Sequence, residues 1–178
     1  MKNVLIVSAS PRRGGNCDLL CDQFAKGARE AGHTVEIVYL QNQKINYCLG
    51  CGGCYPNHAC VQQDGMAPLL DKLVIADVIV LATPVYFYSM SGQLKTFIDR
   101  TVPRYTELVN KDFYFILTAA DKDRENLKRT VESLRGFTED CLEDAHEKGI
   151  IYGVGAWQKG EIVETPAFKE AYLAGKNC

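Results

Sequence analysis

The first group of residues suited to chemistry is the segment 8–16, Ser-Ala-Ser-Pro-Arg-Arg-Gly-Gly-Asn, between an apolar run and a helical pattern. A strand, a small glycine-rich loop and a helix form an anion site, because the first helical turn has unpaired N–H groups at the positive end of the dipole. Ser8, Ser10 and Asn16 add side-chain donors, and the glycines let a ligand approach the backbone. We expect a phosphate monoester here.

This segment lacks two other phosphate-binding patterns. It has no G-x-x-x-x-G-K-[ST], so it does not indicate a nucleoside triphosphate. It has no G-x-G-x-x-G either, so a dinucleotide fingerprint is not expected. The simpler alternative is a strand-to-helix turn capped by Asn16.

The second group is a run of cysteines. Four of the eight cysteines of the chain follow a C-x2-C-x2-C-x5-C spacing, at Cys48, Cys51, Cys54 and Cys60. A secreted disulfide scaffold would spread its cysteines, so this tight cluster favours metal or redox chemistry. Four thiolates on a glycine-rich loop can hold one [4Fe–4S] cluster, whereas zinc more often uses two separated C-x2-C pairs. Free or redox-active thiols are the third alternative.

The third group is an aromatic segment at 83–88, Thr-Pro-Val-Tyr-Phe-Tyr, directly after a continuous apolar run. Exposed aromatic side chains beside an anion site suit a flat conjugated ligand. The alternatives are a hydrophobic loop that covers the core, or a subunit contact. Trp157 and Tyr152 are two further aromatic residues that could approach such a ligand.

The elements that must position these groups alternate along the chain. The periodicity predicts an α/β fold, a flavodoxin-like three-layer sandwich with a five-stranded parallel sheet in the order 2-1-3-4-5. We expect one domain over residues 1–178, with 41–64 as a cysteine-bearing insertion loop. Strands are expected at 3–8, 34–40, 77–82, 112–119 and 149–154, and helices at 16–31, 66–75, 91–102, 123–147 and 166–174.

This strand order brings two of the three groups together. In such sheets ligands bind beyond the carboxyl ends of the strands, beside the switch point between the first and third strands. The segments 8–16 and 83–88 follow those two strands. A phosphate together with a flat polar ring indicates FMN.

Four segments give the chain a more specific resemblance. Residues 8–16, 83–86, 92–100 (Gly-Gln-Leu-Lys-Thr-Phe-Ile-Asp-Arg) and 155–160 resemble the NAD(P)H-dependent FMN reductase family of flavodoxin-like proteins. The resemblance implies FMN bound at the first loop through its phosphate, a ring lined by 84–90, and a homodimer or homotetramer with flavins near subunit interfaces. The cysteine run resembles the compact motif of the iron–sulfur flavoprotein branch, which holds a [4Fe–4S] cluster beside FMN.

The resemblance also assigns candidate site residues. The expected metal ligands are the four cysteines at 48, 51, 54 and 60, and no catalytic side chain is expected. Such proteins usually place a threonine or serine after the loop asparagine, where this chain has Cys17; a thiol is a weak donor, so we expect a weaker flavin site. The expected FMN-binding residues are Ser8, Ser10, Arg12, Asn16, Cys17, Pro84, Val85, Tyr86, Phe87 and Tyr88.

The resemblance implies an enzyme in which FMN accepts hydride from NADH or NADPH. Electrons would then pass to a small acceptor such as a quinone, a flavin, a nitroaromatic or a metal. The alternative is an iron–sulfur flavoprotein that carries electrons between FMN, a [4Fe–4S] cluster and a ferredoxin-like partner. A third reading is a flavin-binding domain with redox-sensing thiols.

Charge and hydropathy limit the partners. The net charge of −2 over 178 residues indicates neither nucleic acid nor an anionic membrane surface. No apolar run approaches the ~20 residues of a membrane span, so we expect a cytoplasmic protein. Asp99 and Arg100 are expected to form a surface ion pair, or to pair across a subunit interface.

Overall fold

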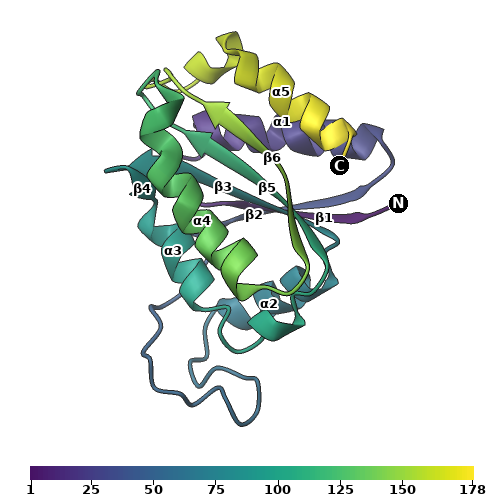
Figure 1. Ribbon diagram of the computed structural model, residues 1–178, viewed down its shortest axis with the longest axis vertical. Helices are drawn as coiled ribbons and strands as arrows, with labels where there is room; N and C mark the ends of the chain where they lie inside the picture. The colour runs from purple at the N-terminus through teal and green to yellow at the C-terminus, as the bar shows by residue number, and fades with distance from the viewer.

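A computed structural model describes residues 1–178, and its centre is a parallel sheet (Figure 1). The strand order is β2-β1-β3-β5-β6, which confirms the predicted order, because the two-residue β4 pairs antiparallel with β3 alone. The strands are β1 Asn3–Ser8, β2 Thr34–Tyr39, β3 Val78–Tyr86, β4 Ser89–Met90, β5 Lys111–Thr118 and β6 Ala145–Gly153.

Helices cover both faces of the sheet, as a three-layer sandwich requires (Figure 1). One face carries α1 and α5, and the other carries α2, α3 and α4, each face with its own apolar core. The α-helices are α1 Asn16–Glu30, α2 Met66–Ile75, α3 Gly92–Asp99, α4 Lys128–Cys141 and α5 Pro166–Lys176. Short 3-10 helices lie at Leu40–Asn42, Tyr105–Glu107, Arg124–Leu127 and Glu161–Glu164. No helix has the length and hydropathy needed to cross a membrane.

The central strands are apolar on both sides because helices cover both faces. The side chains of β1 from Val4 to Ser8 are all buried, as are those of β3 from Val78 to Thr83. The pairing of β1 with β3 runs from Val4 opposite Val78 to Ser8 opposite Ala82. Both strands therefore reach the same edge of the sheet together.

Four predicted elements differ from the structure by three residues or more at an end; the helix expected at 91–102, for example, ends at Asp99. The helix expected at 123–147 consists of a 3-10 turn followed by α4, which ends at Cys141, and the strand β6 already begins at Ala145. Pairing of Ala145 with Lys111 on β5 outweighs the helical periodicity of this stretch. The strand expected to end at 82 runs on to Tyr86, because β4 pairs with its last residues.

Helices α1 and α5 touch backbone to backbone through two glycines. A Cβ on Gly27 would lie 2.1 Å from the carbonyl oxygen of Tyr172, and one on Gly175 would lie 2.0 Å from that of Phe24. Neither position has room for a methyl group. Glycine at these sites therefore serves helix packing at the expense of helix propensity.

We predict opposite effects for two glycine-to-alanine changes within helices. Gly175→Ala forces α5 away from α1 and lowers the free energy of unfolding by roughly 1–3 kcal/mol. Gly136→Ala on α4 places its Cβ no nearer than 4.0 Å to Asp140, so it raises that free energy by about 0.5–1 kcal/mol. Urea unfolding measures both; a stabilising Gly175→Ala would contradict the described packing.

Candidate functional site

A cleft of ≈ 210 Å³ lies beyond the carboxyl ends of β1, β3 and β5. It is the crevice that the strand order predicts, beside the switch point between β1 and β3. Its walls come from the loop after β1, the end of β3, the end of β5 and the segment after β6. The lining residues are Ser10, Arg12, Asn16, Cys17, Pro84, Val85, Tyr86, Thr118, Ala119, Ala120, Ala156 and Trp157.

Buried hydrogen bonds hold the loops after β1 and β3 against each other. The N–H of Ala9 donates to the carbonyl of Ala82 at 2.8 Å and so extends the strand pairing past Ser8. The buried hydroxyl of Ser91 donates to the Ala9 carbonyl at 2.9 Å, and the N–H of Ser91 donates to Thr83 Oγ1 at 2.9 Å. These bonds and the strand pairing together fix the position of the loop after β1 relative to the end of β3.

The N-terminus of α1 opens onto the cleft with no side-chain cap. The capping residue is Gly15, not Asn16, and the N–H groups of Asn16, Cys17 and Asp18 find no acceptor within the protein. Gly14 has a left-handed backbone (φ 62°), and a Cβ on Gly15 would lie 2.9 Å from the Arg12 carbonyl. The turn that the sequence predicts as an anion site is therefore uncapped, with free N–H groups at the start of α1.

A buried carboxylate organises this loop from beneath. Asp18 Oδ1 accepts the hydroxyl of Ser8 at 2.6 Å, and Asp18 Oδ2 accepts Gly14 N at 2.8 Å and Arg13 Nη1 at 3.0 Å. Ser8 is fully buried and does not line the cleft. The hydroxyl of Ser8, which the sequence offers as an anion donor, is thus bonded to Asp18 below the loop.

Asn16 lines the cleft, but its amide is committed elsewhere. Its Nδ2 donates to the carbonyls of Ala156 and Gln158 at 3.2 and 2.9 Å, and its Oδ1 accepts the N–H of Gly160 at 2.9 Å. The side chain thus ties the segment after β6 to the loop. In this arrangement the amide that the sequence offers to a phosphate already has partners within the protein, and the backbone N–H of Asn16 is the group left free.

Arg12 and Trp157 form an exposed rim of the cleft. The Arg12 guanidinium lies 5.7 Å from the centroid of the Trp157 ring, and its Nη1 donates to the Trp157 carbonyl at 3.4 Å. Trp157 is 62% exposed and lines the cleft, as considered from the sequence. Tyr152 does not line it; its ring lies under Arg124 at 5.3 Å.

The aromatic segment divides between the cleft and the turn that follows it. Pro84, Val85 and Tyr86 line the cleft. Phe87 and Tyr88 form the tip of the β3–β4 hairpin with positive φ of 50° and 62°, and neither lines the cleft. Phe87 is fully exposed, and Tyr88 lies against Arg129 on α4. The hairpin therefore holds Phe87 and Tyr88 outside the cleft, although the sequence analysis lists them among the expected FMN-binding residues.

Three cleft residues from the end of β5 were missed, namely Thr118, Ala119 and Ala120, as was Ala156. The predicted strand order contains the signal for the first three, because β5 neighbours β3 and its carboxyl end must reach the same crevice. Small side chains carry no chemical signature in a sequence. They leave space for a ligand and do not bind it by polar contacts.

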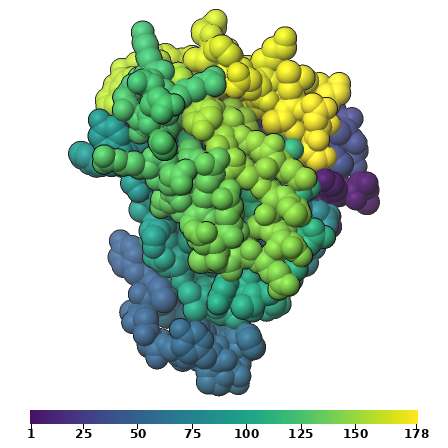
Figure 2. Space-filling model, in the orientation of Figure 1, coloured from purple at the N-terminus to yellow at the C-terminus, as the bar shows by residue number.

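The four clustered cysteines lie in a second place, on the loop between the first 3-10 helix and α2. This loop projects at the lower end of the molecule, below α3 (Figures 1 and 2). Cys48, Cys51, Cys54 and Cys60 all line one cavity of ≈ 140 Å³. They form no disulfide, and no three metal-ligating side chains are arranged around a common point.

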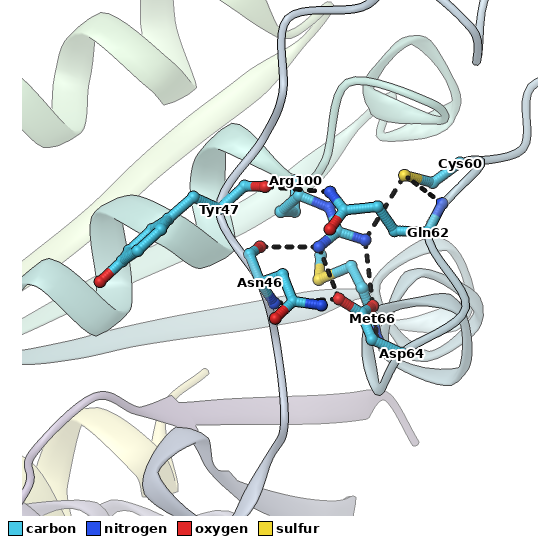
Figure 3. A network of polar contacts seen from close by, with 7 residues as sticks. All are labelled: Asn46, Tyr47, Cys60, Gln62, Asp64, Met66 and Arg100. Atoms are coloured by element: carbon cyan, nitrogen blue, oxygen red, sulfur yellow. Dashed lines mark hydrogen bonds and ion pairs between the residues drawn. The ribbon is translucent and has the colours of Figure 1, made fainter.

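A buried ion pair closes the base of this loop (Figure 3). Arg100 Nη1 lies 2.7 Å from Asp64 Oδ2 and Arg100 Nη2 lies 3.0 Å from Asp64 Oδ1, with the two side chains 1% and 6% exposed. The guanidinium lowers the pKa of the Asp64 carboxyl to about 2. The expectation of a surface ion pair between Asp99 and Arg100 is wrong: Asp99 pairs with Lys95, one helical turn earlier.

A comparison with protein families identifies the family of this chain. The model of the NADPH-dependent FMN reductase family matches residues 2–139. The chain belongs to this family. An iron–sulfur flavoprotein of Archaeoglobus fulgidus is 43% identical over 103 residues, which cover 58% of this chain and 46% of that protein. One of Methanosarcina thermophila is 35% identical over 96 residues, covering 54% and 50%. The chain spans about half the length of these curated relatives.

Solved structures of low sequence identity share the fold. An NAD(P)H:quinone oxidoreductase from Methanothermobacter marburgensis superposes with a TM-score of 0.77 at 19% identity, over 99% of this chain and 96% of that one. An azoreductase from Bacillus anthracis superposes with a TM-score of 0.74 at 16% identity, over the whole of both chains. The flavodoxin-like architecture is thereby established.

Proposed function

We propose that this chain is an FMN-dependent oxidoreductase that takes hydride from NADH or NADPH and passes electrons to a quinone, a flavin or another small acceptor. One flavodoxin-like domain, residues 1–178 with 41–64 as an insertion, carries this activity. The observation that carries the proposal is the chemistry of the cleft: an uncapped helix N-terminus at one end, an aromatic wall at the other, and no carboxylate, imidazole or ammonium among its lining residues.

The residues present fit FMN. Its phosphate would be held by the free N–H groups at the start of α1, with Ser10, Arg12 and Cys17 around it. Its ring would lie along Pro84–Tyr86, opposite the small residues after β5. Bound FMN supplies the hydride chemistry. The chain itself binds and orients the ring, and because hydride transfer needs no acid–base group, we assign no catalytic side chain.

We propose a homodimer or homotetramer with the cleft near a subunit contact. The fully exposed Phe87 and the exposed Tyr88 support it, because large apolar groups gathered beside a binding cleft mark interaction surfaces.

The proposed activity predicts that NADPH at about 1 mM reduces the FMN-loaded protein under anaerobic conditions, with loss of the visible flavin absorbance. Stopped-flow spectroscopy measures the rate, and parallel runs with NADH give the donor preference. Dithionite provides the control for full reduction. Flavin that dithionite bleaches but neither nicotinamide bleaches would reject the reductase function and favour an electron carrier.

Cys17 provides a test of the phosphate position. The residue is 2% exposed and lines the cleft at the start of α1. Cys17→Thr replaces a weak donor by a hydroxyl that donates to a charged acceptor, so we expect FMN to bind roughly tenfold more tightly.

Quenching of flavin fluorescence measures that affinity. Cys141→Thr is the matched control, because it makes the same change at an exposed cysteine at the end of α4, outside the cleft; its FMN affinity should stay at the wild-type value. Unchanged or weaker binding by Cys17→Thr would place the phosphate elsewhere.

A second candidate function concerns the cysteine loop. We propose that its four thiols hold a [4Fe–4S] cluster, which would make the chain an iron–sulfur flavoprotein able to exchange electrons with a ferredoxin-like partner. The support is the shared cavity of Cys48, Cys51, Cys54 and Cys60, and the relatives named iron–sulfur flavoprotein. The donor set fits, and the guanidinium of Arg100 at the cavity wall donates from Nη2 to Cys60 Sγ at 3.4 Å.

Anaerobically isolated protein should then contain about four iron and four sulfide per chain. Cys54→Ser should lower both, whereas Cys141→Ser, at an exposed cysteine outside the loop, should leave both unchanged. Iron near zero in the wild-type protein would reject the cluster. Zinc in its place, or four titratable thiols, would identify the alternative.

A further inference from the structure

Arg100 forms a wall of the cysteine cavity from the end of α3. Its side chain is only 1% exposed, which is rare for arginine unless every charge is matched. It is the one cation among the residues that line the cavity. Burying a guanidinium costs free energy unless it is paired and hydrogen-bonded, so the partners of Arg100 must explain its position.

One part of that explanation is closure of the loop. Arg100 Nη1 donates to the carbonyl of Asn46 at 2.7 Å and to the carboxylate of Asp64 at 2.7 Å. Asn46 N also donates to Asp64 Oδ2 at 2.9 Å. These bonds join the two ends of the cysteine loop to each other and to α3 (Figure 3). The segment that carries the four cysteines is thus held at both of its ends.

The other part concerns sulfur. Arg100 Nη2 donates to Cys60 Sγ at 3.4 Å, and the N–H of Gln62 donates to the same sulfur at 3.5 Å. The cavity thus has four thiols on its wall and a charged donor directed at one of their sulfurs, a combination that suits an anionic, sulfur-rich occupant.

We propose that Arg100 is the positioning residue of this cavity: it fixes Cys60 as a ligand and its charge stabilises the more negative, reduced form of a bound cluster. The inference rests on the proposed cluster. Reduction adds one electron to the bound cluster, taken from dithionite in the titration below, and breaks no bond. Positive charge and N–H···S bonds at the cluster both raise its reduction potential, so removing Arg100 should lower it.

The test compares four variants with wild-type protein after anaerobic reconstitution with iron and sulfide. Asp64→Asn with Arg100→Gln leaves no buried carboxylate unpaired, and it is compared with Asp64→Asn alone, so that the two differ only in the side chain at position 100. Arg100→Lys keeps the charge but loses the planar two-pronged donor. Arg104→Gln is the control: this arginine also pairs with two carboxylates, on Glu107 and Asp71, but does not line the cavity.

Two readouts separate the proposed role from loop closure alone. Iron loss to a chelator should become roughly 10–100-fold faster in the double variant and faster in Arg100→Lys, but should not change in Arg104→Gln. The midpoint potential, from dithionite titration followed by EPR, should be more negative in the double variant than in Asp64→Asn alone, and should stay near the wild-type value in Arg100→Lys.

The outcomes distinguish the two proposals. Wild-type protein that loads no cluster rejects the cluster and this role with it. If the protein loads a cluster but the double variant has the same potential as Asp64→Asn alone, the role of Arg100 is overturned and the cluster stays in place. An equal shift of the midpoint potential in Arg104→Gln would also overturn the role of Arg100, because a positive charge outside the cavity would then have the same effect.

Discussion

The parallel pairing of β1 with β3 is the constraint on which the rest of the structure depends. From Val4 opposite Val78 to Ser8 opposite Ala82 the two strands keep one register, and the bond from Ala9 to Ala82 carries it into the loop. Because of this pairing, the turn at the start of α1 and the segment Pro84–Tyr86 line the same cleft. Helix α3 begins at the same place, since Ser91 both caps it and bonds to Ala9.

In the loop after β1, hydrogen bonds to side chains stabilise the turn, while the first backbone N–H groups of α1 keep no partner in the protein. Asp18 takes the hydroxyl of Ser8, the guanidinium of Arg13 and one backbone N–H. Asn16 fastens the segment after β6. The polar side chains of the loop therefore hold its shape, and the ligand is left with backbone N–H groups at a helix terminus, whose positions the helix fixes.

The sequence predicts the sheet, its order and the crevice, because apolar periodicity and strand alternation depend on burial alone. The strand order also brings Pro84–Tyr86 to this crevice. The sequence does not show the hydrogen bonds of Ser8 to Asp18 and of Asn16 to Gly160, because these are tertiary contacts. It also misreads Arg100: the pairing with Asp64, 36 residues away, is a tertiary contact that no local pattern records.

The central claim is that FMN binds in the cleft between α1 and the end of β3. A crystal structure of the protein saturated with FMN tests it most directly. The account predicts phosphate density within hydrogen-bond distance of the N–H groups of Asn16 and Cys17, and ring density along Pro84–Tyr86. Phosphate density elsewhere, such as in the cysteine cavity, with the turn at the start of α1 holding only solvent, would contradict it.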